Sequence, residues 1–94
     1  MSDSDDLDEQ VHCLHAALAA TEERPVERSA SRWIGEAQAV AGDLAGGDPD
    51  PEVVSERVGH VRDLLSNVEG TGDSEADERV DEARRIAAEI DEVT

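Results

Sequence analysis

The stretch EERPVERS, residues 22–29, decides the fold, because it determines whether the patterns on its two sides form one helix or two. Pro25 has no backbone N–H, and its ring clashes with the turn before it, so a helix that reaches this position ends or kinks. Proline also suits the first turn of a new helix. We therefore expect one helix to end near Glu23 and another to begin near Val26.

Apolar residues recur three and four positions apart on both sides of this stretch, which is the spacing of an amphipathic helix. The series before it predicts a helix over residues 5–23: Leu7, Val11, Leu14 and Leu18. The series after it predicts a helix over residues 26–45: Val26, Ala30, Trp33, Ala37, Val40 and Leu44. We expect Trp33 in the core, and we expect Gly46 and Gly47 to end this helix in a left-handed turn.

The second half of the chain repeats the arrangement. Asp50 and Pro51 fit the N-cap and first position of a helix over residues 51–69. Asp73 or Ser74 can cap a fourth helix, over residues 74–93. The apolar stripes of these two helices are Val54, Val58, Val61, Leu65 and Val68, and then Ala76, Val80, Ala83, Ala87 and Ile90.

Four stripes of similar length with short connections predict one all-α domain over residues 1–94, an antiparallel up-down-up-down four-helix bundle. The alternative depends on residues 22–29. If that stretch does not turn, the first two helices continue with a kink, and the chain is a three-segment helical array that closes by dimerisation.

The charge is strongly one-sided, with 25 acidic residues against 8 basic ones and a net charge of −17. All eight basic residues are arginine. High charge with few aromatics also suits disorder, but four apolar stripes in phase argue for a folded chain. Acidic excess, absence of lysine and an apolar content of Ala, Val, Leu and Ile resemble the cytoplasmic proteins of salt-accumulating haloarchaea, and loosely a group of small uncharacterised helical proteins from them. That resemblance implies a halophilic protein and brings no functional motif.

Several function classes receive no support from the sequence. The first ten residues, MSDSDDLDEQ, are acidic where a targeting segment needs positive charge. No apolar run approaches the roughly 20 residues of a membrane span. We find no phosphate loop, nucleophile elbow or dinucleotide motif. We therefore expect a cytoplasmic protein that is not an enzyme, uses no cofactor, and is too acidic to bind nucleic acid directly.

The stretch VHCLH, residues 11–15, gathers two of the three histidines and the single cysteine. On a helical wheel, Cys13 and His15 point nearly apart, so one ion cannot take all three side chains. His12 and His15, at i and i+3, could still hold one side of a metal ion with His60. A metal-binding or metal-sensing bundle is therefore the alternative function, although solvated surface histidines are the simpler interpretation.

The outward faces of the first two helices predict an interaction surface. The first helix carries small residues away from its core stripe: Cys13, Ala16, Ala17 and Ala20. The second carries the arginines Arg24, Arg28 and Arg32, then the small residues Gly35, Ala39 and Gly42. Glycine in a helix interior costs roughly 1 kcal/mol relative to alanine, so a glycine pair suggests close approach by another helix. We therefore expect a protein-protein interaction or self-association module whose partner is a protein or a second copy.

Overall fold

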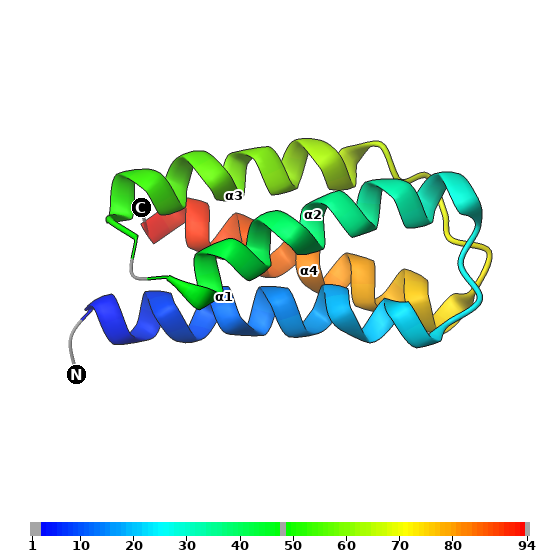
Figure 1. Ribbon diagram of the computed structural model, residues 1–94, viewed down its shortest axis with the longest axis horizontal. Coiled ribbons are helices and arrows are strands. Elements are labelled where there is room, and N and C mark those ends of the chain that lie inside the picture. Colours follow the sequence, from blue (N-terminus) through cyan, green and yellow to red (C-terminus); the bar gives the residue numbers. More distant parts are fainter. Residues whose placement is uncertain (1–2, 48, 94) are drawn as a thin grey trace.

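The chain forms a four-helix bundle with an antiparallel up-down-up-down order (Figure 1). The computed structural model describes residues 3–47 and 49–93, with side chains from residue 7 onward. Its helices are α1 (Asp3–Ala19), α2 (Arg28–Gly46), α3 (Pro51–Ser66) and α4 (Ser74–Val93), with a 3₁₀-helix η1 (Ala20–Glu23) after α1. Each α-helix packs against the next, and α1 also packs against α4. The three-segment alternative is therefore wrong.

The stretch at residues 22–29 turns the chain back, but more gradually than the sequence predicts. η1 tightens the end of the first helix, and Arg24 is extended, with φ −103° and ψ 149°. The second helix begins at Arg28 rather than Val26. The Glu27 backbone N–H donates to the Thr71 carbonyl at 2.8 Å, so this segment is hydrogen-bonded to the loop before α4 instead of to a helical turn.

The core lies along the bundle axis and is built from small and medium aliphatic side chains. The predicted stripes of α3 and α4 are buried, and in α1 so are Val11, Leu14 and Leu18. The buried face of α2 is rotated from the predicted one and is formed by Ala30, Ile34, Ala37, Ala41 and Leu44. Trp33 and Val40 are only partly buried against this core, so Trp33 lies at its margin. The small alanines let α2 approach its neighbours closely, and the bulky indole lies at the side.

The helix ends differ from expectation at two glycines. Gly47 has φ −112° and ψ −166°, which is extended backbone, so the left-handed stop predicted after α2 is wrong. Among the described residues, the left-handed backbone conformation occurs instead at Gly72, with φ 84°. The other end signals hold: Pro51 begins α3 after Asp50, and the Ala76 N–H donates to the Asp73 carboxylate at 2.9 Å.

The third helix ends at Ser66, three residues before the expected boundary. One carbonyl in its last turn and one just beyond its end are bound by a side chain from α4. The Arg84 guanidinium donates to the Leu65 carbonyl at 2.7 Å and to the Val68 carbonyl at 2.6 Å. A cation at this position also offsets the negative end of the helix dipole.

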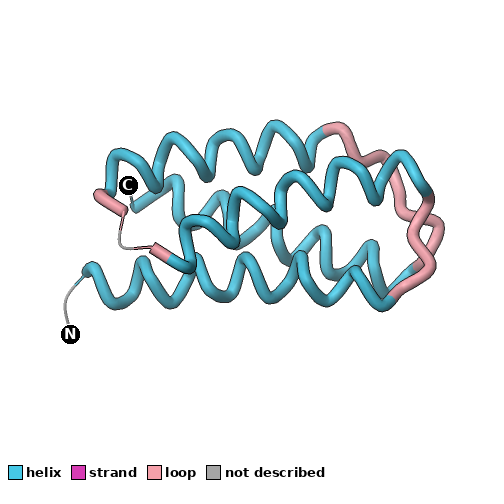
Figure 2. Tube along the Cα trace, viewed as in Figure 1, coloured by secondary structure: helices cyan, strands magenta, loops and turns pink. Residues whose placement is uncertain are grey.

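Two of the three interhelical connections lie together at one end of the bundle (Figure 2). Thr71, whose side chain is fully buried, joins them. Its Oγ1 lies 2.8 Å from the Asp73 carbonyl oxygen and from the Asp77 carboxylate, and it accepts the Asp73 N–H at 3.1 Å. The Thr71 N–H donates to Asp77 as well, at 2.8 Å. This Thr71 cluster fixes the loop between α3 and α4 on the first turn of α4, and the Thr71 carbonyl, which accepts the Glu27 N–H, ties that loop to the segment before α2.

Among the described helices, none combines the length and the apolar character that crossing a bilayer requires.

Candidate interaction surfaces

The outer side of α2 presents two arginines followed by two small residues. Arg28, Arg32, Gly35 and Ala39 are all exposed. The described side chains place no carboxylate within 4.0 Å of Arg28 or Arg32, although ion pairs engage Arg24, Arg62, Arg79 and Arg84. The Arg32 guanidinium carbon lies 5.9 Å from the centre of the Trp33 ring. This part of the predicted surface is therefore accessible.

Gly42 does not belong to that outer row. A Cβ placed on Gly42 would lie 3.3 Å from Nε2 and 3.4 Å from Cδ2 of His15 on α1. We expected Gly42 to lie on an outward face that meets a partner, but the structure places His15 of α1, in the same chain, beside it. Nothing lies within 4 Å of a Cβ placed on Gly35, so that glycine remains open.

Arg24 also leaves the predicted arginine row, because it precedes α2 and lies in the turn. Its Nε is 3.0 Å from the Asp73 carboxylate, and its Nη1 is 3.1 Å from Glu75. The Arg24 side-chain hydrogen bond and the Ala76 N–H lower the pKa of Asp73, and the hydrogen bond to Asp73 raises the pKa of Arg24. Arg24 therefore holds the two loops together rather than facing a partner.

The small strip on α1 is exposed at Cys13, Ala16 and Ala20. Ala17, which we expected to lie in this strip, is only 5% exposed and belongs to the core. His15 packs toward α2 at Gly42, and Cys13 points nearly the opposite way on the helix. The strip is thus on the side of α1 away from α2. The structure separates it from Arg28, Arg32, Gly35 and Ala39 instead of joining both sets in one surface.

The three histidines do not assemble into a metal centre. His12 is exposed beside Asp8, with 3.7 Å between Nε2 and the carboxylate, and His60 lies on α3. Within residues 7–47 and 49–93, no three His, Cys, Asp or Glu side chains are placed to hold an ion. The structure therefore offers no support for the site predicted from His12, His15 and His60.

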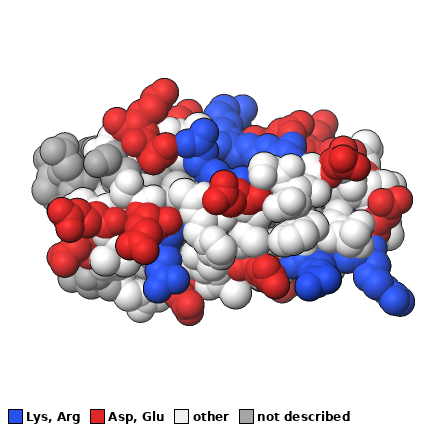
Figure 3. Space-filling view, turned by 90° about the horizontal axis from the view of Figure 1, so that it is seen from above, with Lys and Arg blue, Asp and Glu red and all other residues white. Residues whose placement is uncertain are grey.

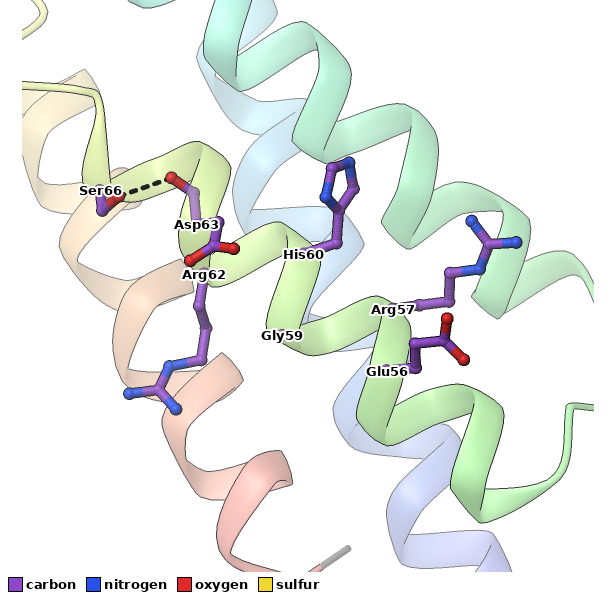
Figure 4. Close-up of a pocket in the computed structure, with 7 residues that line it drawn as sticks. All are labelled: Glu56, Arg57, Gly59, His60, Arg62, Asp63 and Ser66. Atoms are coloured by element: carbon purple, nitrogen blue, oxygen red, sulfur yellow. Dashed lines mark hydrogen bonds between the residues drawn. The ribbon is translucent and has the colours of Figure 1, made fainter.

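The outer side of α3 carries a shallow depression that the sequence does not reveal (Figure 4). All its lining residues come from this one helix: Glu56, Arg57, Gly59, His60, Arg62, Asp63 and Ser66. Arg57 and His60 point toward α2, whereas Arg62 points toward α4, where it pairs with Asp91 at 2.6 Å. A depression bordered by a single helix is open to solvent and does not enclose a small molecule.

A second hollow, of about 310 Å³, lies between the end of α2 and the start of α3. It is lined by Val40, Asp43, Leu44, Gly47, Pro49, Val53 and Arg57. Val53 is 40% exposed, which is unusual in a chain whose other valines and leucines are mostly buried. The sequence contains one sign of this feature, because Val53 falls outside the apolar stripe of α3. Arg57 at its rim has no carboxylate within 4.0 Å among the described side chains.

The fold and these surfaces define a small, acidic, all-helical protein with open rather than enclosed candidate sites. The chain belongs to the family described as domain of unknown function DUF8152, whose model matches residues 10–94. Comparisons with curated proteins and with solved structures found no match.

Proposed function

We propose that this protein is a small interaction module that binds an acidic protein surface through the outer side of α2 and works in molar salt. The observation that carries the proposal is the absence of any carboxylate partner for Arg28 and Arg32 among the described side chains. The chain has 25 acidic residues, so unpaired arginines on its surface need an explanation.

Placing Arg28, Arg32 and Gly35 on the outer side of α2 does not by itself stabilise the helix. Arg28 and Arg32 are four residues apart on one helix, and like charges at this spacing destabilise a helix by about 0.2–0.5 kcal/mol. Gly35, one turn further along, adds the cost of an exposed glycine in a helix interior. Within the chain, Arg32 contacts the Trp33 ring and has Glu36 four positions further on, whereas Arg28 has no ion pair or ring contact among the described residues, so we infer that Arg28 above all is used by a contact outside the chain.

The chemistry of the surface selects the partner. Arginine binds carboxylates through paired hydrogen bonds, and the flat surface at Gly35 and Ala39 lets a second backbone come close. Nucleic acid would also offer anions to arginine, but its binding depends on counterion release and weakens steeply as salt concentration rises, so it is poorly suited to a protein that works in molar salt. An acidic protein surface therefore suits Arg28 and Arg32 better.

Salt determines the conditions under which this module works. A charge of −17 on 94 residues repels itself and any acidic partner in dilute buffer. At about 1 M salt the Debye length falls to roughly 3 Å, and long-range repulsion is mostly screened. Close guanidinium-carboxylate contacts and apolar contacts persist under these conditions.

The proposal is tested by capture of partners from the native cytoplasm in 3 M KCl with the purified chain as bait. Arg28→Glu combined with Arg32→Glu is expected to abolish capture. Arg85→Glu is the matched control, because Arg85 is also exposed and has no ion pair among the described residues but lies on α4. Equal capture by the wild type and the double variant would contradict the proposed function.

A further inference from the structure

Two large apolar side chains are exposed among the described residues, and they lie on opposite sides of the bundle. Val53 is 40% exposed and Val93 is 69% exposed. Val53 lines the hollow between α2 and α3. Asp91 faces α3, because it pairs with Arg62 of that helix. Val93 lies about 200° from Asp91 on the α4 wheel and therefore points away from α3.

Glu56 and Arg57 both lie one helical turn after Val53, and Glu89, whose charge is opposite to that of Arg57, lies one turn before Val93. Arg57 follows Val53 by four positions and has no carboxylate partner among the described side chains. Glu89 precedes Val93 by four positions and is exposed. If α4 of one copy lay antiparallel to α3 of another, Val93 would meet Val53 while Glu89 met Arg57. Residues four apart lie about 5–6 Å apart on a helix surface, so both contacts fit one alignment.

The same two sides of the bundle carry the surfaces predicted from the sequence. The α2–α3 side holds Arg32 over the partly buried Trp33, and Figure 3 shows arginines beside an uncharged area on the face that carries α3. The α1–α4 side holds the exposed strip at Cys13, Ala16 and Ala20, which faces away from α2. The α2–α3 side thus offers Arg57 and a hollow in which Val53 is exposed, with Asp43 and Glu56 also on that side, and the α1–α4 side offers Glu89 and small apolar residues.

We propose that the partner is a second copy of this chain, whose α1–α4 side docks on the α2–α3 side with Val93 in the hollow beside Val53 and Glu89 beside Arg57. This inference rests on the proposed interaction function and names its partner. Two different patches meet in such a contact, so it is heterologous. Each copy keeps one free patch of each kind, and the assembly grows into a ring or a filament instead of stopping at a dimer.

The size of these sides suits a specific contact. The bundle measures 39 × 21 × 21 Å, so one long side covers about 800 Å² (39 Å by 21 Å), close to the area that each partner buries in a standard interface. The net charge of −17 on each copy opposes association in dilute buffer. We therefore expect assembly in molar KCl and monomers at low salt.

The test measures the mass of the purified chain by sedimentation equilibrium in 3 M KCl over increasing concentration. The wild-type mass is expected to rise beyond twice the 10.1 kDa of one chain. Val53→Gln blocks one patch and Val93→Gln blocks the other, without changing the net charge. Each is expected to weaken association about tenfold, the effect of about 1.4 kcal/mol. Gly70→Gln is the control, because nothing lies within 4 Å of a Cβ at Gly70, which is exposed in the loop between α3 and α4, away from Val53.

Mixing the two valine variants separates this arrangement from others. Each variant retains the patch that the other lacks, so an equimolar mixture is expected to form one-to-one dimers and nothing larger. A wild-type chain that stays monomeric would overturn the inference while leaving the Arg28 and Arg32 capture result unaffected. The heterologous contact would be overturned if the wild type stops at a dimer. It would also be overturned if the mixture associates no more strongly than either variant alone. Unchanged circular dichroism of the variants shows that the helices remain folded.

Discussion

Replacing Thr71 by valine is expected to destabilise the bundle strongly, although the two side chains have nearly the same shape. Thr71 is fully buried, and its hydroxyl contacts the Asp73 N–H and the Asp77 carboxylate. Valine removes the hydroxyl, so the Asp73 N–H loses its acceptor and the Asp77 carboxylate keeps only the hydrogen bond from the Thr71 N–H, in a half-buried site. An unsatisfied buried polar group costs about 1–3 kcal/mol, so we expect Thr71→Val to lower the free energy of unfolding by about 2 kcal/mol.

The matched variant is Thr71→Ser, which keeps the hydroxyl and removes one methyl group. Loss of a buried methyl group costs about 0.8 kcal/mol. In a domain of this size, 1 kcal/mol corresponds to roughly 4–8 °C in Tm, so valine should lower Tm by about 10 °C and serine by about half as much. Thermal unfolding followed by circular dichroism at fixed molar KCl measures both. If Thr71→Val melts at or above the temperature of Thr71→Ser, the hydroxyl does not stabilise the loop as argued.

Three further outcomes are expected. Gly35→Ala should raise the free energy of unfolding by about 0.5–1 kcal/mol, because alanine favours the helix and the site is open. Gly42→Ala should raise it by less, since the added Cβ would lie 3.3 Å from Nε2 of His15. A larger increase for Gly42→Ala than for Gly35→Ala would contradict that packing. The folded-state pKa of Asp73 is lowered, mainly by its hydrogen bond from Arg24, so this carboxylate stabilises the fold above its unfolded pKa and loses that effect as pH falls through its folded pKa. In urea unfolding from pH 7 to pH 2, the free energy of unfolding of the wild type should therefore approach that of Asp73→Asn in acid. A difference between the two that stays constant with pH would refute this. Helicity of a desalted sample should rise on addition of 2–3 M KCl, because screening relieves self-repulsion; an unchanged circular dichroism spectrum would contradict the halophilic interpretation.

The antiparallel bundle follows from the sequence because apolar spacing and Pro25 act locally. Helical periodicity needs only the phases of neighbouring residues, and three of the four stripes are buried where expected. The stripe of α2 differs, because Ile34 and Ala41 are buried there while Trp33 is only partly buried at the edge of the core. A wheel drawn for one helix contains no information on how closely the adjacent helices approach.

The candidate surfaces were only partly predictable for the same reason. A wheel places Gly42 beside Gly35, but it cannot say that His15 of another helix occupies the space above Gly42. The sequence also gives no sign that Arg24 binds Asp73, which is 49 residues away. The Thr71 cluster was likewise hidden, because a threonine between two glycines is typical of an ordinary linker. Contacts between segments distant in sequence depend on packing that local patterns do not encode.

The separation of the predicted surfaces has a consequence for how this protein can associate. Cys13 on α1 and Arg32 on α2 belong to adjacent helices, which suggests from the sequence that one partner touches both. The contact between His15 and Gly42 turns the strip at Cys13 away from α2, so a single flat partner covers one surface or the other. A partner that uses both must approach from two sides. In the assembly that we propose, each copy presents its α1–α4 side to one neighbour and its α2–α3 side to the next. The packing of His15 against Gly42 thus separates the two surfaces, which is the arrangement that the proposed heterologous contact requires.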